Sequence, residues 1–208
     1  NPKARWSDGK EVTSADVLAT FDLLMDEGIN MPYNILTYSK FRKPVALSKY
    51  IVEVESKQLN WRNFLYFGGM YIMPAHQISI PGSEYLDLYQ NDYHAVSGPY
   101  TLDKSSLVMN QSLSLERRSD WCVQAMARRI FGWIGLWNFD RYNFTVVDKD
   151  DLALEKAKKG ELDYLAINVS RWWVEDLVPE KVEPISRGLL QKRKFYNHEP
   201  VGTSGLAF

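Results

Sequence analysis

Histidine, cysteine and carboxylate side chains are the groups in this sequence that could do chemistry. The three histidines, His76, His94 and His198, lie far apart and lack the i, i+4 spacing with which a helix presents two zinc ligands. The single cysteine, Cys122, follows Trp121, and a lone cysteine there is typical of a small packed apolar residue. The sequence contains no G-x-S-x-G, P-loop or G-x-G-x-x-G motif. We therefore expect no catalytic residue, no metal site and no cofactor.

The acidic residues, 26 in all, are numerous enough to supply the pair of carboxylates that a glycosidase needs. The best-placed of them have simpler roles, because Asp8 lies in an expected turn and Asp16 at a helix cap. Glu161 and Asp163 flank an expected strand. A binding protein is therefore the favoured class. A hydrolase acting on glycans or peptides through a carboxylate pair stays the alternative, and an adaptor that binds another protein through its aromatic surface is a third class.

The composition is that of an ordinary globular chain without a strong charge. Hydrophobic residues make up 45%, charged residues 25%, and the net charge is −1, so neither nucleic acid nor an anionic membrane is an expected partner. The longest basic cluster, "QKRKF" at residues 191–195, is expected to be a solvated face. No apolar run of about 18 residues predicts a membrane span, and the start of the sequence has no signal-peptide pattern.

Local signals near the start predict one well-defined helix. "WSDG" is typical of a turn, and "TSAD" of a capping box in which Thr13 is the N-cap and the Asp16 carboxylate bonds back to it. Apolar residues at helical spacing follow, and Gly28 is expected to end the helix as its C′ residue. Beyond it we expect a loop over residues 30–45 and a strand over residues 49–57.

The pattern then changes to short alternating strands. Strands are expected near Tyr100, near Leu113 and over residues 141–147, because apolar and polar residues alternate there. A polar stretch with few periodic signals precedes them, so we place a domain change near residues 80–97.

A strand–helix–strand unit is expected next. "DKDDLALEKAKKG" predicts a helix capped by Asp148 or Asp150 and ended by Gly160. The following "ELDYLAI" is predicted to be a strand, and the two strands around the helix would then pair in parallel. "RWWVEDL" is expected to be a second helix and "LLQKRKFYN" a last strand. The fold class is α/β, in two segments.

Several blocks, in order along the chain, resemble one known family. "ARWSDGKEVTSADVLATFDLL" is similar to the block W-S-D-G-x-x-[LV]-T-x-x-D-V, and Met73-Pro74-Ala75-His76 stands in place of a segment written "lPkH". "SGPYTL" is similar to a "GTGPY" turn, "LERRSDW" to "RNPDYW" with Ser119 in place of the proline, and "DLALEKAKKGELDYL" to "ALKSGEID". These are the blocks of bacterial extracellular solute-binding proteins of family 5, the oligopeptide-, dipeptide- and nickel-binding components of ABC importers. Within that family the sequence resembles the microcin- and oligopeptide-binding subgroup most.

The resemblance implies a periplasmic-binding-protein-like fold of type II, with mixed sheets and flanking helices, in which two lobes close on a ligand. Residues 1–85 would form a small subdomain attached to the first lobe, and residues 86–208 would form part of that lobe. Family members usually contain a second lobe that has no counterpart in this sequence. The resemblance therefore suggests an internal fragment of the first lobe.

The resemblance also implies a function. The chain would belong to the substrate-binding component of an ABC importer, which is no enzyme. It would capture peptides or a similar small solute in the periplasm, or outside the cell on a lipid anchor, for permease subunits in the inner membrane.

The candidate site residues follow from the same resemblance. "MPYNILTY" resembles a ligand-facing loop of oligopeptide-binding members, which points to Tyr33, with Asn34 beside it, and more weakly to Tyr38. The loop after the "GELD" strand reaches the ligand cleft in relatives. Its residues would be Asn168, Ser170, Arg171 and Trp172. For Trp172, as for its neighbour Trp173, packing in the core stays equally open.

Overall fold

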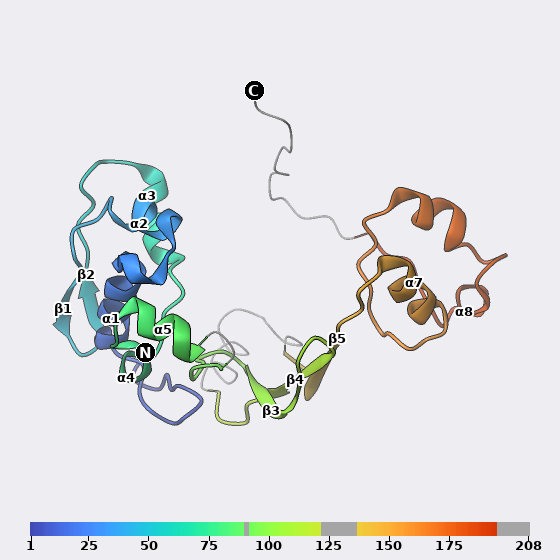
Figure 1. The fold of residues 1–208 in the computed structure, drawn as a ribbon, viewed down its shortest axis with the longest axis horizontal. Helices are drawn as coiled ribbons and strands as arrows, with labels where there is room; N and C mark the ends of the chain where they lie inside the picture. Colours follow the sequence, from blue (N-terminus) through green and yellow to red (C-terminus); the bar gives the residue numbers. More distant parts are fainter. Residues whose placement is uncertain (90–91, 122–136, 195–208) are drawn as a thin grey trace. The chain divides into compact units, whose positions relative to one another are not determined.

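The computed structural model describes residues 1–89, 92–121 and 137–194. The chain separates into two units, each described here by itself: unit 1 is Asn1–Thr145 and unit 2 is Val146–Phe208 (Figure 1). This division reflects packing within the chain. The assignment of residues 1–85 to a subdomain and of residues 86–208 to a lobe stays a prediction.

Some of the residues discussed above lie outside the described part of the chain. They are Cys122, His198 and the last three residues of the predicted strand "LLQKRKFYN".

Helix α1 (Ser14–Met25) begins as the sequence predicts. Thr13 is the N-cap, and its backbone N–H donates to Oδ2 of Asp16 at 2.6 Å, as a capping box requires. The helix ends earlier than predicted, so Gly28 as its C′ residue is wrong. Asp26 adopts extended angles (φ −76°, ψ 123°), and its carboxylate accepts the N–H of Gly28 at 2.7 Å. The Asp26 side chain thus offers the backbone a local alternative to another helical turn.

The remaining elements of the first 89 residues are short. They are η1 (a 3₁₀ helix, Glu27–Ile29), α2 (Pro32–Tyr38), β1 (Val45–Ser48), β2 (Ile51–Glu53), α3 (Trp61–Gly68), α4 (Ala75–Ile78) and α5 (Gly82–Tyr89). The loop predicted over residues 30–45 is wrong for residues 32–38, because Pro32 starts α2 at a position where its missing N–H costs nothing. The strand predicted over residues 49–57 is confirmed only for β2, which pairs antiparallel with β1.

The main core of unit 1 lies between α1, α2 and the segments that flank α3. Phe21, Tyr38, Phe41 and Met70 form a buried cluster. The rings of Phe21 and Tyr38 meet edge to face, with 6.1 Å between their centroids. Burying a side chain of this size contributes roughly 1.5–3 kcal/mol. This cluster therefore holds α2 firmly against α1.

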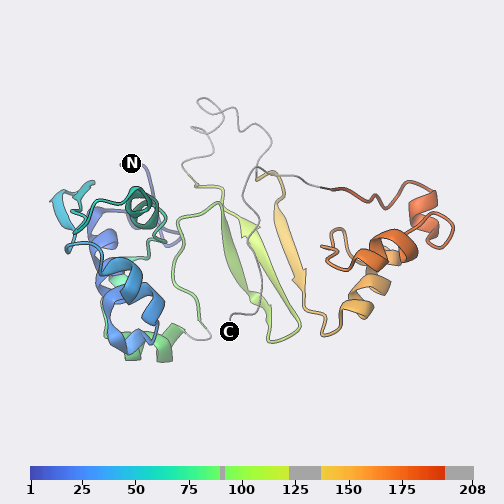
Figure 2. The ribbon, with the colours of Figure 1, turned by 90° about the horizontal axis from the view of Figure 1, so that it is seen from above.

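The strands predicted between residues 97 and 147 are confirmed. They are β3 (Tyr100–Val108), β4 (Ser112–Arg117) and β5 (Arg141–Thr145), which form an antiparallel sheet in the order β3-β4-β5 (Figure 2). Leu102 pairs with Leu115, and Leu115 pairs with Tyr142, so these three side chains share one face. The apolar residues of the alternating pattern therefore lie together on that face.

Unit 2 contains α7 (Asp150–Lys158), the π-helical turn η2 (Trp172–Asp176) and α8 (Glu183–Ser186). The N-cap of α7 is Lys149, so the prediction of Asp148 or Asp150 as the cap is wrong. Gly160 ends α7 as predicted. It has φ +76°, its N–H donates to the carbonyl of Ala157, and the N–H that follows donates one residue further back, which together form a Schellman motif.

The two strands predicted after α7 are wrong, and so is the parallel pairing expected across this helix, because the strand before it, β5, pairs antiparallel with β4. "ELDYLAI" and the described part of "LLQKRKFYN" are irregular, and the described residues of unit 2, 146–194, contain no strand. A strand needs a neighbour for its N–H and C=O groups, and these two segments instead lie on the wall of one cavity. The helix predicted at "RWWVEDL" is present as η2.

Candidate functional site

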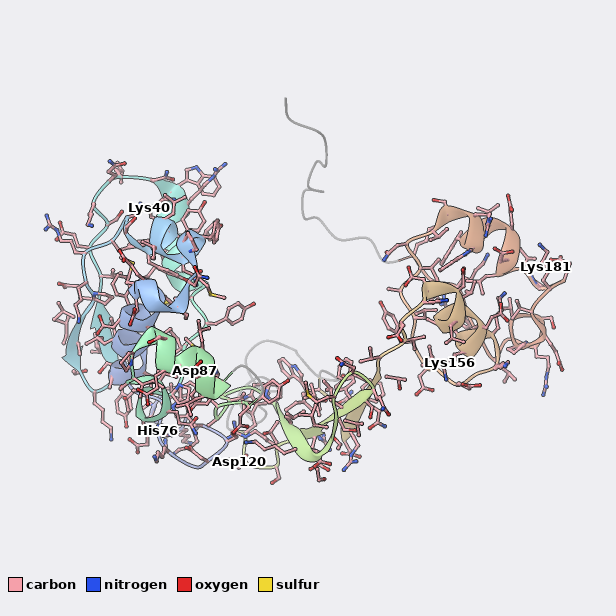
Figure 3. All side chains as sticks on the ribbon, in the orientation of Figure 1. Lys40, His76, Asp87, Asp120, Lys156 and Lys181 are labelled. Atoms are coloured by element: carbon pink, nitrogen blue, oxygen red, sulfur yellow. The ribbon has the colours of Figure 1, made fainter. Side chains whose placement is uncertain are left out.

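Two of the sequence blocks that carry the family resemblance, "WSDG" and residues 73–76, meet in unit 1. Nε2 of His76, which Figure 3 labels, lies 2.6 Å from Oδ2 of Asp8. Partial burial alone would raise the pKa of Asp8, but the N–H of Lys10 and the His76 ring together hold this pKa below its ordinary value. Asp8 is thus an ionised turn residue that binds the start of α4, and not a proton donor.

Asp16 and Thr20 hold the segment just before α4 against α1. Oδ1 of Asp16 accepts the N–H of Ala75 at 2.7 Å, while Oγ1 of Thr20 accepts the N–H of Met73 at 2.9 Å. Both side chains are buried. The prediction that Asp16 has a structural role is confirmed, and the role extends beyond the helix cap.

Arg118 is a structural residue that sequence reasoning missed. Its side chain is 4% exposed, and its guanidinium donates to the carbonyls of Trp6 at 3.0 Å and Val96 at 2.9 Å. It also binds both carboxylate oxygens of Asp120, labelled in Figure 3, and these bonds lower the pKa of that carboxyl. The "LERRSDW" block contains two arginines, and nothing in its pattern indicates which of them is buried.

The first group of candidate ligand-binding residues lies on α2 in unit 1. Tyr33 is 71% exposed, so its ring is free to meet a ligand. Asn34 is half-buried, with Nδ2 donating to Sδ of Met31 at 3.2 Å. Tyr38 is buried in the core beside Phe21, and burial raises the pKa of its hydroxyl. The ring of Tyr38 thus serves packing, and it positions the helix that carries the other two.

The second group lies in unit 2, around a cavity of about 350 Å³. Asn168 is exposed and lines this cavity, whereas Ser170 and Arg171 are exposed just before η2. Nε of Arg171 lies 3.8 Å from a carboxylate oxygen of Asp176. Trp172 is 9% exposed and packs in the core of the unit. Its neighbours there are Leu154, Leu177 and Val182.

Trp173 and Lys192 line the same cavity and were not among the predicted site residues. Nζ of Lys192 donates to the carbonyl of Trp173 at 2.6 Å and lies 5.1 Å from the centroid of its ring. Successive residues of a helical turn point in different directions, so Trp172 and Trp173 of η2 face different surroundings. The adjacent tryptophans were the available signal, but their sequence does not show which one faces the core.

The described ranges 1–89, 92–121 and 137–194 contain no group of three or more His, Cys, Asp or Glu side chains that could hold a metal ion. In the same ranges no helix has both the length and the apolar character needed to cross a membrane.

One relative is similar to this chain in sequence, and two solved structures are similar to it in fold. The peptidoglycan-binding protein YepA of Agrobacterium fabrum is 28% identical over 217 residues, which cover 100% of this chain and 33% of that protein. NikZ from Campylobacter jejuni, in complex with Ni(L-His), superposes with a TM-score of 0.65 at 13% identity and covers 85% of this chain and 33% of its own. The oligopeptide-binding protein AppA from Bacillus subtilis, in complex with a nonapeptide, superposes with a TM-score of 0.63 at 18% identity, and the match covers 84% of this chain and 32% of AppA.

The two superpositions establish the fold, and the match to a family model establishes the family. At such identities the two solved structures support the fold alone, a partial periplasmic-binding-protein-like fold with mixed helices and sheets. The chain spans about a third of the length of the relatives that it matches. Residues 1–206 match the model for the middle part of one family. The chain belongs to the bacterial extracellular solute-binding proteins of family 5.

Proposed function

We propose that this chain is part of the substrate-binding component of an ABC importer that captures peptides in the periplasm. The observation that carries the proposal is the family match over residues 1–206. The Bacillus subtilis protein of the same fold that binds a nonapeptide supports peptides as the cargo. The component would pass its cargo to permease subunits in the inner membrane, and no bond would be made or broken.

Each exposed candidate residue has chemistry that suits a peptide. The Asn168 amide can both donate to and accept from a peptide backbone, and it lies at the wall of an apolar cavity. Tyr33 offers a flat ring with a polar end, and the half-buried Asn34 beside it offers a second amide. Ser170 and Arg171 would bind from the loop before η2. Trp172 and Tyr38, both buried, would position these residues from the core.

The alternative, a hydrolase that uses a carboxylate pair, needs one carboxyl group that stays protonated near neutral pH. In the described part of the chain, every carboxyl group with a shifted pKa has it lowered, because hydrogen-bond donors or cations bind the ionised form. These groups are Asp8, Glu11, Asp26, Asp92, Asp103, Asp120 and Glu161. This favours binding over hydrolysis.

Isothermal titration of the complete protein with a mixed library of short peptides tests the proposal. We expect saturable binding, and we expect Asn168→Ala to weaken it by about two- to ten-fold, the range for one lost hydrogen bond. Tyr33→Ala should also weaken binding. Tyr71→Ala is its control, because Tyr71 is likewise an exposed tyrosine of unit 1. No binding by any peptide, or release of cleaved peptide, would refute the proposal.

A further inference from the structure

Three basic residues beside the cavity of unit 2 lack an ion pair among the described residues. They are Lys192, Arg193 and Lys194, from the cluster predicted to be a solvated face. Five other cations of this unit lie within 4.0 Å of a carboxylate: Lys156, Lys158, Arg171, Lys181 and Arg187 (Lys156 and Lys181 are labelled in Figure 3). Lys149 and Lys159 have no ion pair among the described residues either, but they do not line the cavity. A solvated face accounts for the exposed Arg193 and Lys194. It does not account for Lys192, which is half-buried.

The surroundings of Lys192 fix its ammonium at the cavity wall. One of its three N–H donors goes to the carbonyl of Trp173 at 2.6 Å. The indole ring of Trp173 attracts it further, and Nζ of Lys194 lies 5.8 Å from the centroid of the same ring. The other two N–H donors of Lys192 therefore have no partner among the described residues, although the two contacts with Trp173 already hold the ammonium in place.

Basic side chains outnumber acidic ones among the residues that line the cavity. Its apolar wall comes mainly from leucines of α7 and of the segments after it. Asp163 is the single acid among the lining residues, whereas Lys192 and Arg193 both line it. An anion that enters would meet a fixed ammonium and a guanidinium, with the amide of Asn168 on the same wall.

We propose that this cavity binds a carboxylate group of the ligand, so that the protein selects peptides with acidic side chains. This inference rests on the proposed capture of peptides and narrows it. The contact is a pair of partly exposed charges, for which a preference of about five-fold over the neutral amide is the upper end. Because part of the site is solvated, added salt should weaken the preference.

A matched pair of peptides measures the effect. The complete protein is titrated calorimetrically with Ala-Ala-Glu-Ala-Ala and with Ala-Ala-Gln-Ala-Ala, which differ in one charge. We expect the glutamate peptide to bind about five-fold more tightly, and we expect Lys192→Gln to reduce this ratio to below about two-fold. Lys192→Arg should keep the ratio. Lys149→Gln should keep it as well, because it removes the same charge from the N-cap of α7, which does not line the cavity.

A second readout separates this inference from peptide capture. The indole N–H resonance of Trp173, assigned by its loss in Trp173→Phe, is followed while glutarate is added to the ¹⁵N-labelled protein. A saturable shift that Lys192→Gln abolishes would support the carboxylate site even if neither peptide binds. Equal binding of both peptides by the unmodified protein would overturn the inference and leave peptide capture intact. Absence of any glutarate-dependent shift would overturn it as well.

Discussion

Replacing Arg118 by methionine should destabilise unit 1 more than any comparable change of surface charge. Methionine keeps most of the apolar stem and removes every donor of the guanidinium. The carbonyls of Trp6 and Val96 retain backbone donors, because the N–H groups of Gly9 and Ser7 also bind them. The carbonyls of Arg5 and Gly98, which accept from Arg118 at 3.2 and 3.3 Å, lose that donor.

The magnitude follows from those two carbonyls. Both carbonyls are only partly buried, so water can reach them, and the loss of each donor costs about 1 kcal/mol; the free energy of unfolding should fall by roughly 2 kcal/mol. For a chain of this size, about 2–4 °C in Tm corresponds to each kcal/mol, so the midpoint should fall by roughly 4–8 °C. Asp120 adds little, because its side chain is 56% exposed and water replaces the lost partner.

Thermal unfolding followed by circular dichroism provides the assay, with Arg117→Met as the control. Arg117 is the adjacent residue of the chain and forms an ion pair with Asp140, whose side chain is 88% exposed. That pair should contribute less than about 1 kcal/mol. If the two methionine variants unfold at the same temperature, the bonds of Arg118 to residues 5–6 and 96–98 do not stabilise unit 1, and the reasoning is refuted.

Three further changes test other contacts. Gly82→Ala should lower the free energy of unfolding, measured with denaturant, by about 1–3 kcal/mol, because the new Cβ would lie 2.5 Å from a backbone nitrogen of η1. Gly68→Ala is the control and should leave the free energy of unfolding unchanged, because the space at its Cβ is open. The pKa of Asp26 is lowered by the N–H of Gly82 and by a second backbone N–H. The stabilisation that this carboxylate gives the fold is therefore complete above the ordinary pKa of about 3.8 and is lost as the pH falls through the pKa of the folded state. Asp26→Asn should flatten this part of an acid titration of Tm, and an unchanged slope would contradict the role of Asp26. Trp172→Ala should lower the free energy of unfolding by about 3–5 kcal/mol and Trp173→Ala by clearly less, measured by urea titration, and equal losses would mean that both rings belong to the core.

The elements that could be predicted are those whose signals are local. The capping box of α1 and the Gly160 end of α7 depend on residues within one turn, and both occur as predicted. The early end of α1 was not predictable, because the second oxygen of the Asp26 carboxylate accepts the N–H of Gly82, 56 residues further along. The strands expected in unit 2 failed for a related reason, since a strand pattern does not reveal whether a partner strand is present.

The family resemblance pointed to Tyr33, which is exposed, and to Asn168, which lines the cavity, and their contact with a ligand stays a prediction. It could not separate Trp172 from Trp173, because their exposure depends on how η2 packs on α7. Lys192 was missed, because a basic cluster in a sequence looks the same whether it is solvated or held against an aromatic ring.

The carboxylate of Asp16 has a consequence for the order of folding. Its Oδ2 binds the N–H of Thr13, three residues away, and this contact can form as soon as the first turn of α1 does. Its Oδ1 binds the N–H of Ala75, 59 residues away, and that contact must wait for a long loop to close. One side chain therefore takes part in both an early and a late step. One oxygen of the Asp16 carboxylate thus stabilises the first turn of α1, and the other stabilises the packing of α4 against it.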